Sequence, residues 1–327
     1  MPRRLQGRRG SARSPRASVV ILTKEARSAS RVRGRSLSGC VRDRHDVRAA
    51  PARRLAGSVR RGRGDEMSDP VPPSVPALVT GASSGIGEGF ARQLAARGHD
   101  LTLVARRTER MQALAKELRA QHSVKVSVHT ADLGTHAGRG PVATMLRTKG
   151  PWLLINNAGF GSRGRFVDLD AKREAEEVEL NVVTVHELTA AVLPGNVDAA
   201  KGAVINVAST AAYQAIPYMA TYAATKAFVL HFTEAIAQEL HGTGVRAMAL
   251  CPGPTRTEFD QVAGMSALFN MPLPMSADAV VRSALRALDR GHAICVPGPH
   301  NLILAQGPRL VPRSAVRRIV STIFDPR

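Results

Sequence analysis

A tyrosine and a lysine four residues apart, Tyr222 and Lys226, form the pair in this sequence best suited to move a proton. They lie in a helical pattern, so the phenol and the ammonium share one face. Free tyrosine has a pKa of about 10, and a neighbouring cation lowers it toward neutral pH, where the phenol can act as a general acid or base. Ser209, thirteen residues upstream, ends a strand-like run, where its hydroxyl can hold a substrate carbonyl. Each signal alone is weak, because such pairs are usually surface residues.

A glycine-rich turn, Thr80-Gly-Ala-Ser-Ser-Gly-Ile-Gly87, stands between a strand-like run and a helical pattern. Gly81 permits a tight turn, Gly85 lets the backbone approach a pyrophosphate, and Gly87 lets the helix pack closely. The run also satisfies G-x-S-x-G, with Ser83 as a hydrolase nucleophile, but that turn follows a later strand of a hydrolase sheet. No Gly-Lys-Ser/Thr closes the run, which excludes a P-loop. The turn predicts a dinucleotide site that includes Ser83, Ser84 and Ile86.

Two arginines, Arg106 and Arg107, follow the second strand-like run, where an NAD enzyme carries an acidic residue for the ribose hydroxyl. A guanidinium donates two parallel hydrogen bonds to phosphate, and the missing carboxylate removes a repulsion. The pair therefore favours NADP(H) over NAD. The alternative is a solvated pair that opens the next helix, 108–121. Asp132 and Leu133, after the third run, are suitably placed to flank an adenine ring.

The elements that must position these groups alternate between short β-branched runs and longer helical patterns, which is typical of βαβ units. Together they predict an α/β fold with a doubly wound, seven-stranded parallel sheet of Rossmann type, in a single domain over residues 67–297. In such a sheet the ligand binds at the carboxyl ends of the strands, near the switch in strand order. The predicted strands are 77–80, 100–105, 125–130, 152–156, 202–207, 245–251 and 293–297.

In combination, these residues resemble the classical short-chain dehydrogenase/reductase family, in its NADP-preferring form, over nearly all of residues 75–297. The motifs stand in the family's order and at its usual spacings. They are Thr80-Gly-x3-Gly-Ile-Gly87, Asn156-Asn-Ala-Gly159, Asn181 in Leu180-Asn-Val, Ser209, Tyr222-x3-Lys226 and Pro252-Gly253.

The resemblance implies a role for each matching residue. Tyr222 would be the general acid/base, Lys226 would bind the nicotinamide ribose and lower the tyrosine pKa, and Ser209 would orient the carbonyl. Asn181 would hold a water in a proton relay. The cofactor would be lined by Asn157, Ala158 and Gly159, and its nicotinamide end would be surrounded by Pro252, Gly253 and Thr255.

The implied activity is that of an NADP(H)-dependent oxidoreductase that reduces a ketone or aldehyde to an alcohol, or the reverse. Residues 257–275, rich in Met, Leu and Phe, predict a lid-like pocket wall and an apolar substrate, or else simply cover the core. Tyr218 is interpreted as pocket wall. The ten histidines include no H-E-x-x-H or similar ligand spacing, so no metal is implied. The family usually assembles as dimers or tetramers, so a homodimer or homotetramer is expected.

The net charge of +20 is concentrated at the N-terminus, because residues 1–66 hold 18 arginines and one lysine against 5 acidic residues. With so few apolar residues, this basic leader is expected to be disordered. Three interpretations stay open: a nucleic-acid-binding arm, an Arg-rich transit peptide, or translated sequence ahead of a true start at Met67, which is favoured. The leader has no aromatic residue to stack on bases, so nucleic acid is not the expected partner.

The C-terminal tail, residues 298–327, contains a basic amphipathic pattern over 313–324. Docking against its own body or a sister subunit is the expected outcome, and contact with a membrane surface is the alternative. Three scattered cysteines and no apolar run of about 18 residues fit a cytoplasmic protein. Two other functions remain open: a nucleic-acid-associated protein that uses the leader, and a noncatalytic NADP-sensing module on the same fold.

Overall fold

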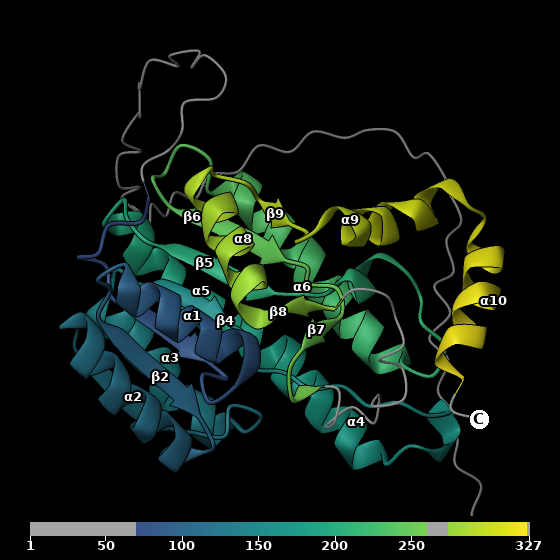
Figure 1. Ribbon diagram of the computed structural model, residues 1–327, viewed down its shortest axis with the longest axis horizontal. Helices are drawn as coiled ribbons and strands as arrows, with labels where there is room; N and C mark the ends of the chain where they lie inside the picture. Colours follow the sequence, from purple (N-terminus) through teal and green to yellow (C-terminus); the bar gives the residue numbers. More distant parts are fainter. Residues whose placement is uncertain (1–69, 260–273, 326–327) are drawn as a thin grey trace, which may run out of the picture. The chain divides into compact units, whose positions relative to one another are not determined.

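A seven-stranded, fully parallel sheet forms the centre of the computed structural model, which describes residues 70–259 and 274–325 (Figure 1). The leader and most of the predicted lid-like segment lie outside the described residues. All seven predicted strands are present, in the order β3-β2-β1-β4-β5-β6-β9, which confirms the predicted fold class. The strands are β1 Ala77–Thr80, β2 Leu101–Ala105, β3 Val126–Thr130, β4 Leu153–Asn156, β5 Ala203–Val207, β6 Arg246–Leu250 and β9 Ile294–Cys295.

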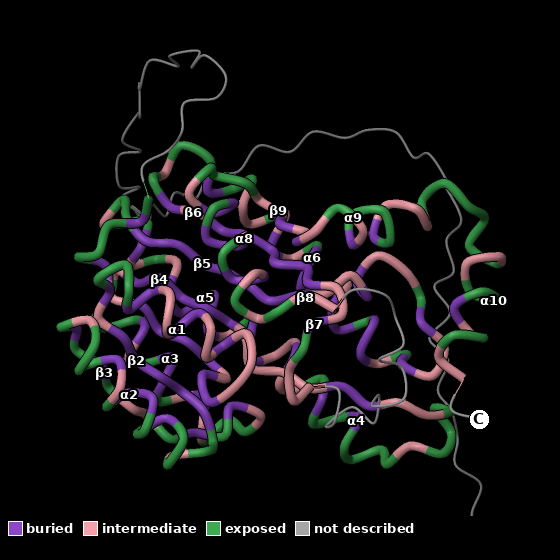
Figure 2. The backbone as a smooth tube through the Cα atoms, viewed as in Figure 1, coloured by how far each residue is buried: buried purple, intermediate pink, exposed green. Residues whose placement is uncertain are grey.

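Helices cover both faces of this sheet, as its apolar strands require, and Figure 2 shows the central strands buried. Successive side chains point to opposite faces, so Val79 packs into one core with Phe90, while Leu78 packs into the other with Leu188. Helices α1 Gly85–Ala96, α2 Thr108–His122 and α8 Ala277–Asp289 cover the first face. Helices α3 His136–Lys149, α5 Thr184–Asp198 and α6 Ala220–Glu239 cover the second.

The strand order reverses between β1 and β4, because the chain first runs outward through β2 and β3 and then crosses back to β4. The connections that leave β1 and β4 therefore diverge to opposite sides and leave a crevice at their carboxyl ends. This places the glycine turn after β1 beside the Asn157–Gly159 segment after β4.

Several elements lie outside this sheet. Helix α4, Ala171–Val178, continues into a π-helical turn, Glu179–Val183, and a second sheet pairs β7, Thr255–Arg256, with β8, Met275–Ser276. The chain ends in α9, Pro299–Gln306, and α10, Arg313–Phe324, and α10 has the predicted bounds. Short 3-10 turns cover Phe166–Asp168, Thr210–Tyr213 and Gly307–Leu310. Within the described ranges no helix is both long and apolar enough to cross a membrane.

Candidate active site

The glycine turn after β1 has the backbone geometry that its sequence predicts. Gly81 and Gly85 lie in the left-handed region, with φ of +65° and +58°, and a Cβ on Gly87 would collide with the carbonyl oxygen of Gly81. The Thr80 hydroxyl accepts hydrogen bonds from the backbone N–H groups of Asn157 (2.9 Å) and Ala158 (3.0 Å). These bonds connect the turn after β1 to the loop after β4.

Arg106 and Arg107 are not equivalent. Arg107 donates to the Ser83 hydroxyl at 3.1 Å and to the Ser84 hydroxyl at 2.6 Å, and forms an ion pair with Glu258 at 2.6 Å. The Arg107 and Arg110 guanidinium groups hold the pKa of the Glu258 carboxyl down at about 2. Arg106 makes no hydrogen bond or ion pair in the part of the chain that the structure describes. Arg107 thus holds the glycine turn through the two serine hydroxyls. Arg106, which is also exposed, lines the cavity wall.

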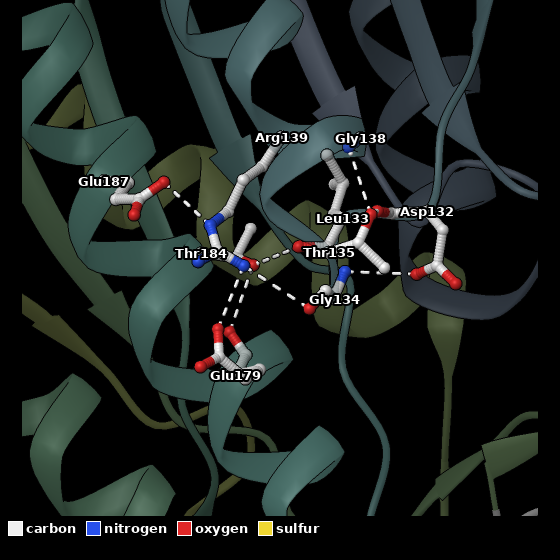
Figure 3. Close-up of polar contacts among 9 residues, drawn as sticks. All are labelled: Asp132, Leu133, Gly134, Thr135, Gly138, Arg139, Glu179, Thr184 and Glu187. Carbon is white, nitrogen blue, oxygen red and sulfur yellow. Dashed lines mark hydrogen bonds and ion pairs between the residues drawn. The ribbon is translucent and has the colours of Figure 1, made fainter.

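The segment after β3 is fixed by a buried arginine, as Figure 3 shows. Arg139 is 6% exposed and forms ion pairs with Glu187 of α5 at 2.7 Å and with Glu179 of the π-helical turn at 3.0 Å. Beside it, Asp132 and Leu133 line the cavity where an adenine ring was predicted. Arg139 also donates to the Gly134 carbonyl oxygen at 3.3 Å, so it links this part of the cavity wall to the turn that carries Asn181.

The predicted proton-transfer residues line one cavity. Tyr222 and Lys226 are both buried on α6, and the Lys226 Nζ lies 5.7 Å from the centre of the tyrosine ring. The ammonium donates to the Val207 carbonyl oxygen at 2.9 Å, which fixes it at the end of β5. Ser209 follows β5, and its hydroxyl oxygen accepts a hydrogen bond from the Ala211 N–H at 3.1 Å. These three side chains border the same space.

Asn181 lies just behind this cavity, in the π-helical turn after α4, a type of irregularity that is frequent at functional sites. Its side-chain oxygen accepts from the Phe160 N–H at 3.2 Å, and its amide nitrogen donates to the Phe160 carbonyl at 2.8 Å and to Thr225 at 3.2 Å. A Cβ on Gly159 would lie 2.8 Å from the Asn181 side-chain oxygen and 3.5 Å from the Lys226 Nζ. Gly159 thus lets these two groups approach each other.

Two buried ionisable groups belong to α4 and α6, which pack on each other. Burial lowers the pKa of the Lys226 ammonium to about 8, and the Glu177 carboxylate opposes this shift. Burial raises the pKa of the Glu177 carboxyl to about 7. The sequence analysis did not single out Glu177, because α4 carries five charged residues among eight, a pattern typical of a solvated helix.

A cavity of about 710 Å³ brings together all of the predicted site residues except Gly87 and Asn181, which lie behind its wall. One end is polar, with the glycine turn and both arginines. The other end is apolar and is closed in part by the C-terminal helix. Its apolar lining includes Ile216, Met219, Phe259, Val316, Val320 and Phe324.

The C-terminal helix α10 docks on the body of the same chain, as the sequence analysis expected. Val320 is buried in a cluster that includes Tyr222. Arg163 donates to the carbonyl oxygens of Phe324 at 3.1 Å and Asp325 at 2.8 Å. Tyr218 was predicted to line the pocket, but it is absent from the cavity wall; it lies in the left-handed region (φ +66°) and donates to the Asp325 carboxylate at 3.4 Å. Tyr218 therefore helps to hold α10 in place.

The cavity fits a dinucleotide by its own chemistry. One end combines a turn that excludes side chains, two serine hydroxyls and two guanidinium groups, which are the donors that phosphate groups prefer, and a lysine lies farther along. Among the described residues no group of three or more His, Cys, Asp or Glu side chains is arranged to hold a metal ion.

Comparison with known proteins assigns the family. The chain belongs to the short chain dehydrogenase family, whose model matches residues 76–265. The short-chain dehydrogenase from Sphingobium yanoikuyae in complex with NADPH superimposes with a TM-score of 0.68 at 36% identity, over 77% of this chain and 96% of that one.

Two curated relatives differ in what they are named for. The very-long-chain 3-oxoacyl-CoA reductase of Anas platyrhynchos is 30% identical over 217 residues, 64% of this chain and 67% of the relative. The inactive hydroxysteroid dehydrogenase-like protein 1 of Homo sapiens is 30% identical over 181 residues, 54% of each chain. The chain thus spans about half the length of the human relative. These comparisons establish membership of an oxidoreductase family.

Proposed function

We propose that the protein is an NADP(H)-dependent oxidoreductase that reduces a ketone or aldehyde of an apolar substrate to an alcohol, or catalyses the reverse reaction. The observation that carries the proposal is the single cavity that joins a phosphate-binding turn, the Ser209, Tyr222 and Lys226 side chains, and an apolar end.

The proposed cofactor site begins at the glycine turn and ends near Pro252, Gly253 and Thr255. Arg106 would bind the 2'-phosphate that distinguishes NADP from NAD, and Arg107 would hold the turn in shape through Ser83 and Ser84. Asp132, Leu133 and the Asn157–Gly159 segment would line the remainder. The NADPH bound to the Sphingobium relative supports this choice. When bound, the nicotinamide supplies or accepts the hydride.

The chain's own task is to hold the carbonyl and to move a proton. Ser209 would donate a hydrogen bond to the carbonyl oxygen, and Tyr222 would deliver the proton to that oxygen in the reductive direction. Lys226, fixed by the Val207 carbonyl, would bind the ribose and keep a positive charge beside the phenol. Asn181, held by Phe160 and Thr225, would position a water that returns a proton to the site.

An apolar substrate is proposed because the cavity beyond Tyr222 is walled by aliphatic and aromatic side chains. Phe259 packs on the Tyr222 ring, with the ring centres 5.4 Å apart, and Val320 of α10 closes the same end. The name of the avian relative, a reductase of very-long-chain oxoacyl groups, supports the same substrate chemistry.

The second candidate function is a noncatalytic NADP-binding module. It is supported by the human relative, which is named as an inactive protein. The two candidates separate in one experiment, in which the oxidation of NADPH is followed at 340 nm with a panel of apolar ketones and aldehydes. Turnover that is lost in Tyr222→Phe supports the enzyme. Tight NADPH binding without turnover on any substrate supports the module.

We also propose a homodimer or homotetramer in the cytoplasm, with residues 1–66 dispensable for the reaction and no nucleic-acid partner. A partly exposed Phe228 on the outer side of α6, stacked on Phe232 at 5.3 Å, suits a contact between subunits. Light scattering of the purified chain measures the assembly.

The C-terminal surface suits an anionic lipid surface as a further partner. Leu310 is 89% exposed and Ile303 is 72% exposed, beside four exposed arginines and a single acidic residue in the described range 298–325. The arginines are Arg309, Arg313, Arg317 and Arg318. Cosedimentation with phosphatidylcholine vesicles, with and without phosphatidylglycerol, tests this contact. Binding of the full chain that persists unchanged in Leu310→Asp would refute it.

A further inference from the structure

The apolar end of the cavity reaches the protein surface between the two C-terminal helices. Ile303 and Leu304 of α9 and Ile319 and Ile323 of α10 line the cavity. All four side chains are nevertheless between 43% and 72% exposed. Large apolar side chains that surround a cavity and still face water are typical of a ligand-binding groove that is open at one end. The space between these helices is therefore an apolar groove that leads from the Tyr222 side of the cavity to the surface.

The sequence of α10 turns its apolar face toward this groove. Val316, Ile319, Val320 and Ile323 recur at helical spacing, and all four line the cavity. An amphipathic helix normally buries such a face against the core of its own chain. Here only Val320 is buried. Most of the apolar face of α10 is thus left for a molecule that occupies the groove.

The groove has the chemistry and the length to hold a hydrocarbon chain. Every side chain that α9, α10 and the turn between them contribute to the cavity is apolar, including Pro308 and Val311 of the turn. A second hydroxyl or carbonyl group on the substrate would find no side-chain partner there, whereas a hydrocarbon chain needs none. The row from Val316 to Ile323 extends about 10 Å along the helix, at about 1.5 Å per residue. An extended aliphatic chain fits this row better than a polar or compact group.

We propose that the substrate carries an unbranched hydrocarbon chain, which lies in the groove between α9 and α10 while its carbonyl group meets Tyr222. The inference rests on the proposed function, which places the reacting carbonyl beside this tyrosine. Val320 and Tyr222 belong to one buried cluster, so the inner end of the groove begins at the reacting group. Ile303 and Ile319, the most exposed of the four side chains named first, then determine specificity at the outer end.

The first experiment measures kcat/KM of the full chain with NADPH for straight-chain methyl ketones from butanone to decanone, without lipid or detergent. Each methylene group that leaves water favours binding by about fourfold, so kcat/KM should rise steeply along the series. A total rise of less than about tenfold would overturn the inference. A preference for cyclodecanone over decanone, which has the same number of carbon atoms, would also overturn it, because the occupant would then be a ring.

Neighbouring residues of α9 provide a matched pair of variants. Leu302 and Ile303 are both apolar and exposed, but only Ile303 lines the cavity. In Ile303→Asp the ratio of kcat/KM for decanone to that for butanone should fall by about tenfold or more, because a carboxylate replaces an apolar contact with the chain. In Leu302→Asp, which adds the same charge outside the cavity lining, the ratio should stay within about twofold of the wild type. An equal fall in both variants would contradict the groove.

The same comparison can be made on α10. Ile319 lines the cavity and Thr322 does not, and both are exposed. Ile319→Asp should lower the decanone to butanone ratio, and Thr322→Asp should leave it within about twofold of the wild type. Thermal midpoints of all four variants show whether each is folded, so that a lower ratio can be assigned to the groove.

The second experiment needs no turnover and decides the inference if the wild type reduces none of these ketones. The fluorescent straight-chain acid cis-parinaric acid is titrated into the full chain. Its affinity should fall by about tenfold in Ile303→Asp and stay within about twofold in Leu302→Asp. In that case the proposed function fails and the hydrocarbon groove stands. No binding, or equal binding to both variants, would overturn the groove. Conversely, ketone reduction without any dependence on chain length would leave the proposed function in place and refute this inference.

Discussion

Replacing Glu177 with methionine should make the protein more stable, and more so as the pH rises. Methionine matches the glutamate in length and needs no hydrogen-bond partner in a buried position. In the folded chain the pKa of Glu177 is raised from 4.5 to about 7, chiefly by burial. The wild-type protein therefore keeps its full stability below the unfolded pKa of 4.5 and loses stability as the pH rises through 7, because the carboxylate must then ionise in the interior.

The magnitude follows from the shift. About 2.5 units at 1.36 kcal/mol each give about 3 kcal/mol of destabilisation at pH 8 that is nearly absent at pH 4.5. The Lys226 ammonium attracts the carboxylate and lowers its pKa, so its contribution is already contained in this shift. For a chain of this size, about 3 kcal/mol corresponds to about 6 to 12 °C in the thermal midpoint.

The assay is urea unfolding at pH 5 and pH 8, followed by circular dichroism. The free energy of unfolding of Glu177→Met should exceed that of the wild type by about 3 kcal/mol at pH 8 and by much less at pH 5. Glu176→Met, on the exposed side of the same helix, should show no such pH dependence. An equal difference between Glu177→Met and wild type at both pH values would refute the burial of an ionised carboxylate at this position.

Four further predictions test the site and the domain division. Tyr222→Phe should lower kcat by about 10²- to 10⁴-fold in a carbonyl reduction assay while NADPH affinity, measured by fluorescence titration, stays within about twofold. Arg106→Ala should weaken NADPH by about 10- to 100-fold and NADH hardly at all in parallel titrations, and equal losses would count against a phosphate contact. Arg139→Gln should lower the free energy of unfolding in urea by about 2 to 3 kcal/mol, because it leaves Glu179 and Glu187 without their buried partner. Residues 67–327 alone should bind NADPH, and loss of binding in a folded protein would contradict the proposed division.

The sheet was predictable because each strand is a short apolar run, and parallel strands buried on both faces need such runs. The 3-10 and π-helical turns could not be predicted from the sequence. No feature of residues 171–198 marks the π-helical turn at Glu179–Val183, where Glu179 forms an ion pair with the distant Arg139. The two-residue strands β7 and β8 are too short to leave a pattern in the sequence.

Most residues of the candidate site could be predicted from the sequence. What each of them contacts could not. Nothing in the sequence separates Arg106 from Arg107, because the difference comes from Glu258, 151 residues later in the chain. The burial of Glu177 was hidden for a similar reason. Five of the eight residues of α4 are charged, and only the packing of α4 on α6 determines which of them lose contact with water.

The two ends of the cavity are built by different parts of the chain, and this has a consequence for substrate choice. The polar end consists of loops at the carboxyl ends of β1 to β4, which the parallel sheet fixes. The apolar end depends on α10, which is held through Val320 and through the bonds from Arg163 and Tyr218 to the last described residues. Changes along α10 are therefore expected to alter which apolar group fits beside Tyr222 and to leave the proposed dinucleotide site unchanged, because none of the residues assigned to that site belongs to α10.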